Sequence, residues 1–243
     1  MTNRFYEAGE KRAARVNELF AAIASRYDLI NDLQSFWLHR SWKRKLVRLA
    51  NPKPGERALD LCCGTGDVAF LLAEAGAKAV GLDFSEPMLA RGRAKVPPAT
   101  SHPPGVVNPQ FIQGDAQATP FPENHFDVVT VGYGLRNLAS WERGLEEMLR
   151  VARPGGRLLV LDFGKPDNAV WRGLYFGYLR RIVPLFGKVF CGDSQTYAYI
   201  LESLNRYPAQ RGVAAKMQKM NCADVRVVNV LGGAMTINYG VKH

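Results

Sequence analysis

The sequence predicts an α/β domain in which helices cover both faces of a mostly parallel sheet. Short apolar runs such as 57–61 are too brief for helices, and they alternate with segments whose apolar residues repeat at helical spacing. The first run leads directly into a turn with two glycines, Gly64 and Gly66, which can adopt positive φ and leave the backbone bare. The last two runs, 224–231 and 234–241, alternate Val, Ile, Thr and Tyr as antiparallel strands do. We therefore expect a doubly wound sheet of seven strands whose last strand is antiparallel.

In chain order, a helical N-terminal segment, 1–56, precedes the sheet. Within it, apolar residues over 11–26 repeat at the spacing of an amphipathic helix. The predicted strands are 57–61, 78–82, 110–113, 126–132, 157–163, 224–231 and 234–241. A helix is expected at 67–74, with an acidic residue in its first turn, and Ser140 is expected to cap the helix that follows the fourth strand.

The stretch 165–220 is expected to form a helical cap inserted after the fifth strand. Apolar residues fall at helical spacing in its first part, at Trp171, Leu174, Tyr175, Tyr178, Leu179 and Ile182. A cap of this kind covers a site at the strand ends, and the arginines that flank the stripe would also let it touch lipid. With 243 residues, of which 47% are hydrophobic, residues 1–243 are expected to form a single domain with one buried core.

Acidic residues mark the carboxyl edge of the predicted sheet. Asp60 lies in the first strand, and Asp83 and Asp115 follow the second and third strands. A carboxylate at the position of Asp83 can accept hydrogen bonds from both hydroxyls of a ribose. The glycine turn has no Lys or Arg to pair with a pyrophosphate, so a cationic ligand fits it better. The glycine pattern over 64–69 also fits the relaxed dinucleotide fingerprint, which leaves an NAD-dependent dehydrogenase as an alternative from another enzyme class.

The pattern hydrophobic-Asp-x-x-x-Gly-Thr-Gly, followed by Asp83 and Asp115, resembles that of the Rossmann-like class I methyltransferases, which bind S-adenosyl-L-methionine. A second pattern is more specific, and reads Tyr27-Asp28-x-x-Asn31-x-x-x-Ser35-x-x-x-His39-x-x-Trp42. It resembles the ubiquinone/menaquinone biosynthesis C-methyltransferase family, from which Ile30 and Gln34 depart. The resemblance implies C-methylation of a prenylated quinol. The leading candidate reaction converts demethylmenaquinol to menaquinol. The benzoquinol step of ubiquinone and the phytyl-naphthoquinol step of phylloquinone are the alternatives.

The same resemblance, which spans about residues 15–241, implies the residues of the site. The cofactor contacts that it implies are Asp60, Gly64, Thr65, Gly66, Asp83, Phe84, Asp115, Ala116 and Gly132. Arg136 is implied as the group that holds a developing quinolate. Further candidates for contacts with ring hydroxyls are His39, Asp28 and Tyr133. No metal is expected, since the four cysteines lack the spacing of metal ligands and are expected to stay reduced.

The net charge of +10 is unevenly distributed. Residues 1–57 and 165–220 each carry +6, whereas 58–164 carry −3. Because the basic residues are interleaved with large apolar ones, we expect peripheral contact with an anionic membrane rather than binding to nucleic acid. A basic RNA-binding module, the non-enzymatic alternative, would need stacking aromatics on an open sheet. The sequence has neither an apolar run of 18 residues nor a signal-like N-terminus, so the chain is expected in the cytoplasm, on the inner face of the membrane. The sequence does not decide whether the chain forms a homodimer.

Overall fold

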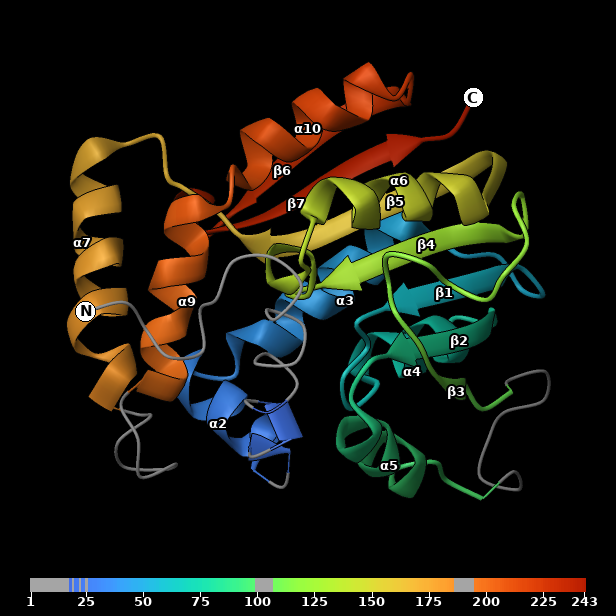
Figure 1. Cartoon of the computed structure of the whole chain (residues 1–243), viewed down its shortest axis with the longest axis horizontal. Coiled ribbons are helices and arrows are strands. Elements are labelled where there is room, and N and C mark those ends of the chain that lie inside the picture. Colours follow the sequence, from blue (N-terminus) through green and yellow to red (C-terminus); the bar gives the residue numbers. More distant parts are fainter. Residues whose placement is uncertain (1–17, 19, 22, 25, 99–106, 186–194) are drawn as a thin grey trace.

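The centre of the computed structural model is a seven-stranded sheet with the order β3-β2-β1-β4-β5-β7-β6 (Figure 1). The structure describes residues 18–243 apart from 19, 22, 25, 99–106 and 186–194. The strands are β1 (Arg57–Leu61), β2 (Lys78–Asp83), β3 (Gln110–Gln113), β4 (Phe126–Gly132), β5 (Ala152–Phe163), β6 (Ala223–Val230) and β7 (Met235–Val241). Pairs among β1 to β5 are parallel, and β7 is antiparallel to both β5 and β6. The predicted sheet, with its antiparallel last strand, is confirmed.

Helices cover both faces of this sheet. They are α2 (Tyr27–Gln34), α3 (Leu38–Ala50), α4 (Asp67–Glu74), α5 (Glu86–Ala94), α6 (Trp141–Val151), α7 (Ala169–Arg181), α9 (Gln195–Arg206) and α10 (Ala209–Lys219), with 3₁₀ turns η2 (Leu135–Asn137) and η3 (Leu231–Gly233). Residues of α3 and α4 pack in one apolar cluster, and residues of α6 and α10 pack in the other. The helix expected at 67–74 is confirmed, and Ser140 caps α6 by accepting a hydrogen bond from the N–H of Arg143 at 3.2 Å.

The two apolar clusters explain why the central strands read as continuous apolar runs. In β4, Val129 and Val131 pack in the cluster that contains Leu145 of α6. Val128, which directly precedes Val129, packs in the cluster that contains Leu72 of α4. Because successive side chains of a strand point to opposite faces, a strand that is covered on both sides must be apolar at nearly every position.

Three sequence-based expectations differ from the structure or fall outside the described residues. The helix predicted over 11–26 falls mostly outside the described residues. The fifth strand begins at Ala152 rather than at 157, because its ladder with β4 skips over 153–156 and then resumes at Arg157. The apolar stripe of the cap is only partly used for packing, since Tyr175 and Leu179 are buried whereas Leu174 is 65% exposed.

Two glycines with positive φ, one in the turn after β1 and one before β1, differ in the space that a Cβ would find. Gly66 has φ +87, and a Cβ there would lie 2.5 Å from the ring of Phe111, whereas Gly55 has φ +84 and open space around its Cβ. Gly55→Ala should therefore show only the left-handed strain, about 1–2 kcal/mol, and Gly66→Ala should lose about 1–3 kcal/mol more through overpacking. Urea unfolding of both variants measures the difference. Equal losses would mean that the ring of Phe111 yields to the added methyl group.

Candidate active site

The site is built at the carboxyl edge of the sheet, where β1 and β2 end side by side. Asp83 at the end of β2 accepts hydrogen bonds from the N–H of Gly64, at 2.8 Å, and from the N–H of Ser85, at 2.9 Å. Each carboxylate oxygen keeps further acceptor capacity, which can serve ligand hydroxyls. Burial raises the pKa of Asp83, while the backbone donors oppose that shift. The carboxylate thus fixes the turn and still presents acceptors to a neighbouring cavity.

That cavity, which we call the cofactor cavity, brings together most of the residues predicted to bind the cofactor. Its lining includes Gly64, Asp83, Phe84, Asp115, Ala116 and Gly132, with Tyr133 at one side. No Lys or Arg is among the described residues that line it. An acidic wall without a basic partner suits a ligand that carries a sulfonium and an ammonium, and does not suit a pyrophosphate. The acidic residues that line this cavity therefore fit S-adenosyl-L-methionine.

Three of the predicted cofactor residues are not among the residues that line the cofactor cavity. Asp60 is buried in β1 and accepts a hydrogen bond from Thr130 Oγ1 at 2.7 Å, and burial raises its pKa to about 7. Thr65 Oγ1 donates to Asp28 Oδ1 at 2.7 Å. Gly66 faces the ring of Phe111. Asp28, predicted to contact a ring hydroxyl, likewise lines neither cavity and pairs with Lys95 at 2.6 Å.

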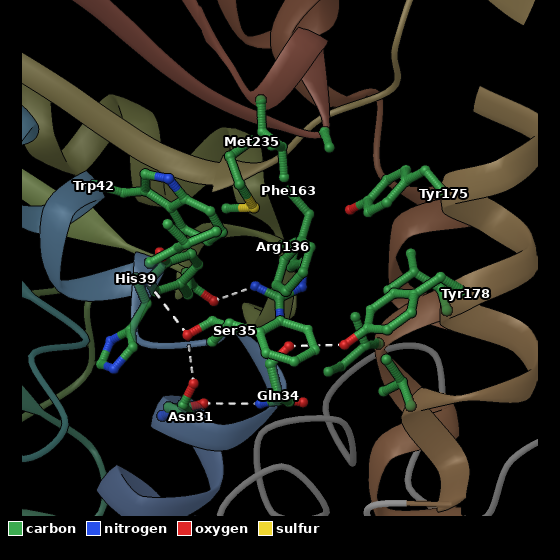
Figure 2. Close-up of a pocket in the computed structure, with 18 of the residues that line it drawn as sticks. Asn31, Gln34, Ser35, His39, Trp42, Arg136, Phe163, Tyr175, Tyr178 and Met235 are labelled. Carbon is green, nitrogen blue, oxygen red and sulfur yellow. Dashed lines mark hydrogen bonds between the residues drawn. The ribbon is translucent and has the colours of Figure 1, made fainter. Parts of the chain in front are cut away.

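A second and larger cavity, of about 360 Å³, lies against the first. We call it the acceptor cavity. Its walls come from α2, the start of α3, η2, α7 and the start of β7, and Figure 2 shows Trp42, Phe163, Tyr175, Tyr178 and Met235 around it. The lining is predominantly apolar, and Phe20, Tyr27 and Tyr133 belong to the walls of both cavities. A ligand in the acceptor cavity therefore adjoins a ligand in the cofactor cavity.

Arg136 lies in the wall of the acceptor cavity and is paired with a buried carboxylate. Its Nη1 donates to Asp162 Oδ1 at 2.7 Å, and both side chains are about 95% buried or more. The guanidinium also lies over the ring of Phe163, 4.6 Å from its centroid. Sequence reasoning missed this partner, although Arg136 follows β4 and Asp162 is near the end of the adjacent β5. The pair is neutral overall, so Arg136 acts as an oriented donor more than as an isolated cation.

His39 also lines the acceptor cavity. Its Nε2 lies 2.8 Å from Asp32 Oδ1, and Arg40 holds the pKa of Asp32 below its usual value. An ionised Asp32 requires the proton to be on Nε2, and burial lowers the pKa of His39, so the ring is neutral. Nδ1 is buried and has no hydrogen-bond partner among the residues that the structure describes. It is therefore an acceptor.

Comparison with known proteins decides between the enzyme classes. The model of the ubiE/COQ5 methyltransferase family matches residues 7–242. The chain belongs to this family. It is therefore a methyltransferase that uses S-adenosyl-L-methionine, as the sequence resemblance implied, and the dehydrogenase and RNA-binding alternatives are set aside.

Individual relatives cover nearly the whole chain. A ubiquinone/menaquinone biosynthesis C-methyltransferase UbiE of Ectopseudomonas mendocina is 40% identical over 237 residues, which are 96% of this chain and 90% of the relative. A demethylmenaquinone methyltransferase of Shouchella clausii is 37% identical, over 96% of this chain and 98% of the relative. Among solved structures, a methyltransferase of Thermotoga maritima, described as a possible histamine N-methyltransferase, aligns with a TM-score of 0.64 at 18% identity, over 93% of this chain and 99% of that one. That likeness concerns the fold.

The position of Asp83 makes a prediction for cofactor affinity. Asp83→Ala should lower the affinity for S-adenosyl-L-methionine by a few hundredfold or more, since two hydrogen bonds to a charged acceptor contribute about 3–5 kcal/mol. It should also lower the melting temperature, because the N–H groups of Gly64 and Ser85 lose their acceptor. Calorimetric titration measures the affinity. The control is Glu86→Gln, a nearby acid that pairs with Arg93 at the surface; near-native affinity in a folded Asp83→Ala protein would disprove the assignment.

Proposed function

We propose that this chain methylates a ring carbon of a prenylated quinol, with demethylmenaquinol as the substrate. The observation that carries the proposal is the large apolar cavity that shares a wall with the cofactor cavity. An apolar space of this kind accepts an aromatic ring and the start of a prenyl tail. The names of both relatives include menaquinone, which supports a naphthoquinol ring over a benzoquinol.

The chemistry explains why so few polar groups line the acceptor cavity. S-adenosyl-L-methionine, when bound, supplies an electrophilic methyl group on a sulfonium. A quinol carbon accepts a methyl group only when a neighbouring hydroxyl is ionised, because the anion places negative charge on that carbon. Opposite charges cancel in the transfer, so walls that exclude water favour it. We assign to Arg136 the hydrogen bond that holds the ionised oxygen, and to His39 Nδ1 the acceptor for the proton that the hydroxyl releases.

The substrate should react only in its reduced form, because a quinone carbon is electron-poor. In an anaerobic assay with radiolabelled S-adenosyl-L-methionine, demethylmenaquinone reduced with dithionite should be methylated, and the oxidised compound should not. Parallel assays with the reduced demethylated precursors of ubiquinone and phylloquinone identify the ring. Equal rates for oxidised and reduced substrate would refute the quinolate argument, and a preference for the benzoquinol would reassign the step.

The rim of the acceptor cavity suggests how a lipid substrate enters. Phe36, Leu38 and Leu174 line the cavity and are also exposed, by 68%, 43% and 65%. Trp37, 56% exposed, adjoins them in the turn between α2 and α3. Among the described residues, no helix has the length and apolar character to cross a membrane. We propose that this rim rests on an anionic membrane. The basic charge of residues 1–57 and 165–220 would add a salt-dependent attraction to that surface.

Attachment to vesicles tests the rim. The double variant Phe36→Ser and Trp37→Ser should sediment with anionic vesicles at least tenfold more weakly than the parent, because burial of each ring contributes about 1.5–3 kcal/mol. Binding should also weaken as salt rises. Val107→Ser is the control, since Val107 is 61% exposed before β3 and lines neither cavity. Unchanged binding of the double variant, or equal binding to neutral and anionic vesicles, would rule out this surface.

A further inference from the structure

The tyrosines that line the acceptor cavity differ in how their hydroxyls are used. Tyr178 donates to the carbonyl oxygen of Gln34 at 2.7 Å, as the dashed line in Figure 2 shows. Tyr27 forms a side-chain hydrogen bond with Asn31. The hydroxyls of Tyr133 and Tyr175 are buried and have no hydrogen-bond partner among the residues that the structure describes. Of these four described phenols, the two of Tyr133 and Tyr175 are therefore available to a ligand.

Tyr175 is the clearer case. It lies on α7, is 8% exposed, and lines the acceptor cavity without reaching the cofactor cavity. Figure 2 shows its hydroxyl directed into the cavity, toward Phe163 and Arg136. A buried hydroxyl without a partner destabilises a protein, whereas phenylalanine would provide the same ring without that loss. The hydroxyl is thus placed for something that enters the cavity.

We propose that the Tyr175 hydroxyl donates a hydrogen bond to the ring oxygen of the substrate that lies farther from the methyl donor. This inference rests on the proposed function. A quinol carries two oxygens at opposite ends of its ring, and the methylated carbon lies beside one of them. That nearer oxygen must face the wall shared with the cofactor cavity, where Tyr133 lies. Arg136 adjoins that wall, because its Nη1 donates to the carbonyl oxygen of Tyr133. Tyr175 lies on α7, outside the shared wall, and then meets the other oxygen. Burial raises the pKa of Tyr175, so the phenol stays protonated and donates.

The consequence is a preference for rings that carry both oxygens. A naphthol analogue can keep the hydroxyl beside the methyl-accepting carbon and carry hydrogen in place of the far hydroxyl. Its carbon is still nucleophilic, so it remains a substrate, but it offers Tyr175 no acceptor. The parent chain should use the quinol with a kcat/KM about tenfold higher than the naphthol, the effect expected for one hydrogen bond.

The test combines Tyr175→Phe with these two substrates. The variant should lose about tenfold in kcat/KM on the quinol and nothing further on the naphthol, so that its preference disappears. Its melting temperature should be equal to or higher than that of the parent, and its affinity for S-adenosyl-L-methionine should be unchanged. The matched control is Tyr178→Phe on the same helix, which breaks the bond to Gln34. It should lower the melting temperature and keep the preference for the quinol.

The outcomes separate the two proposals. A Tyr175→Phe enzyme that still prefers the quinol would overturn the assignment of Tyr175 and leave the proposed function standing. A parent chain that methylates no prenylated quinol would overturn the proposed function and this inference together. A loss that is equal on both substrates, with a lowered melting temperature, would mean that Tyr175 is structural, and would also overturn the inference.

Discussion

The site depends on one constraint, which is that parallel strands end at the same edge of the sheet. β1, β2 and β4 are neighbours in the order β2-β1-β4, and the residues that follow them meet at that edge. The hydrogen bonds from Gly64 and Ser85 to Asp83 then join the turn after β1 to the end of β2. The carboxylate is held by the backbone and needs no cation, so the cofactor cavity stays acidic.

The N-terminal helices complete the site because polar contacts tie them to the glycine turn. Asp28 of α2 accepts from Thr65, and Lys43 of α3 pairs with Asp67 at the start of α4 at 2.7 Å. Lys43 is almost buried, so the pair is strongly oriented. These contacts set the positions of α2 and α3 relative to the sheet. The wall that both cavities share, which includes Tyr27, follows from that placement.

The positive charge of Arg136, in the wall of the acceptor cavity, is balanced by the negative charge of Asp162. Arg136 and Asp162 neutralise each other, and Phe163 stacks against the guanidinium. An isolated cation in so apolar a place would be costly to bury, and it would bind any anion. The pair keeps the guanidinium in one orientation, with its position set by the adjacent ends of β4 and β5. Specificity then rests on single hydrogen bonds, of the kind that we assign to Tyr175.

The sequence by itself determined the sheet and the acidic edge. Strands that are buried on both faces have continuous apolar sequences, which makes them recognisable. Glycine turns and acidic residues at strand ends are also local sequence signals, so Asp83 and Asp115 could be placed in advance. The family resemblance, carried by residues 27–42 and the glycine turn, led to the enzyme class that the comparisons then established. It could not separate Asp60 and Thr65, which do not line the cofactor cavity, from Asp83, which does.

Only the tertiary structure decided the partners. Asp162 lies 26 residues from Arg136, and no local pattern pairs them. Tyr175 and Tyr178 belong to one apolar stripe, and helical spacing predicts that both face inward. Yet the hydroxyl of Tyr178 meets a carbonyl of α2, whereas that of Tyr175 meets no hydrogen-bond partner in the part of the chain that the structure describes. Periodicity specifies the face of a helix on which a residue lies, whereas the partner depends on what another part of the chain brings to that face.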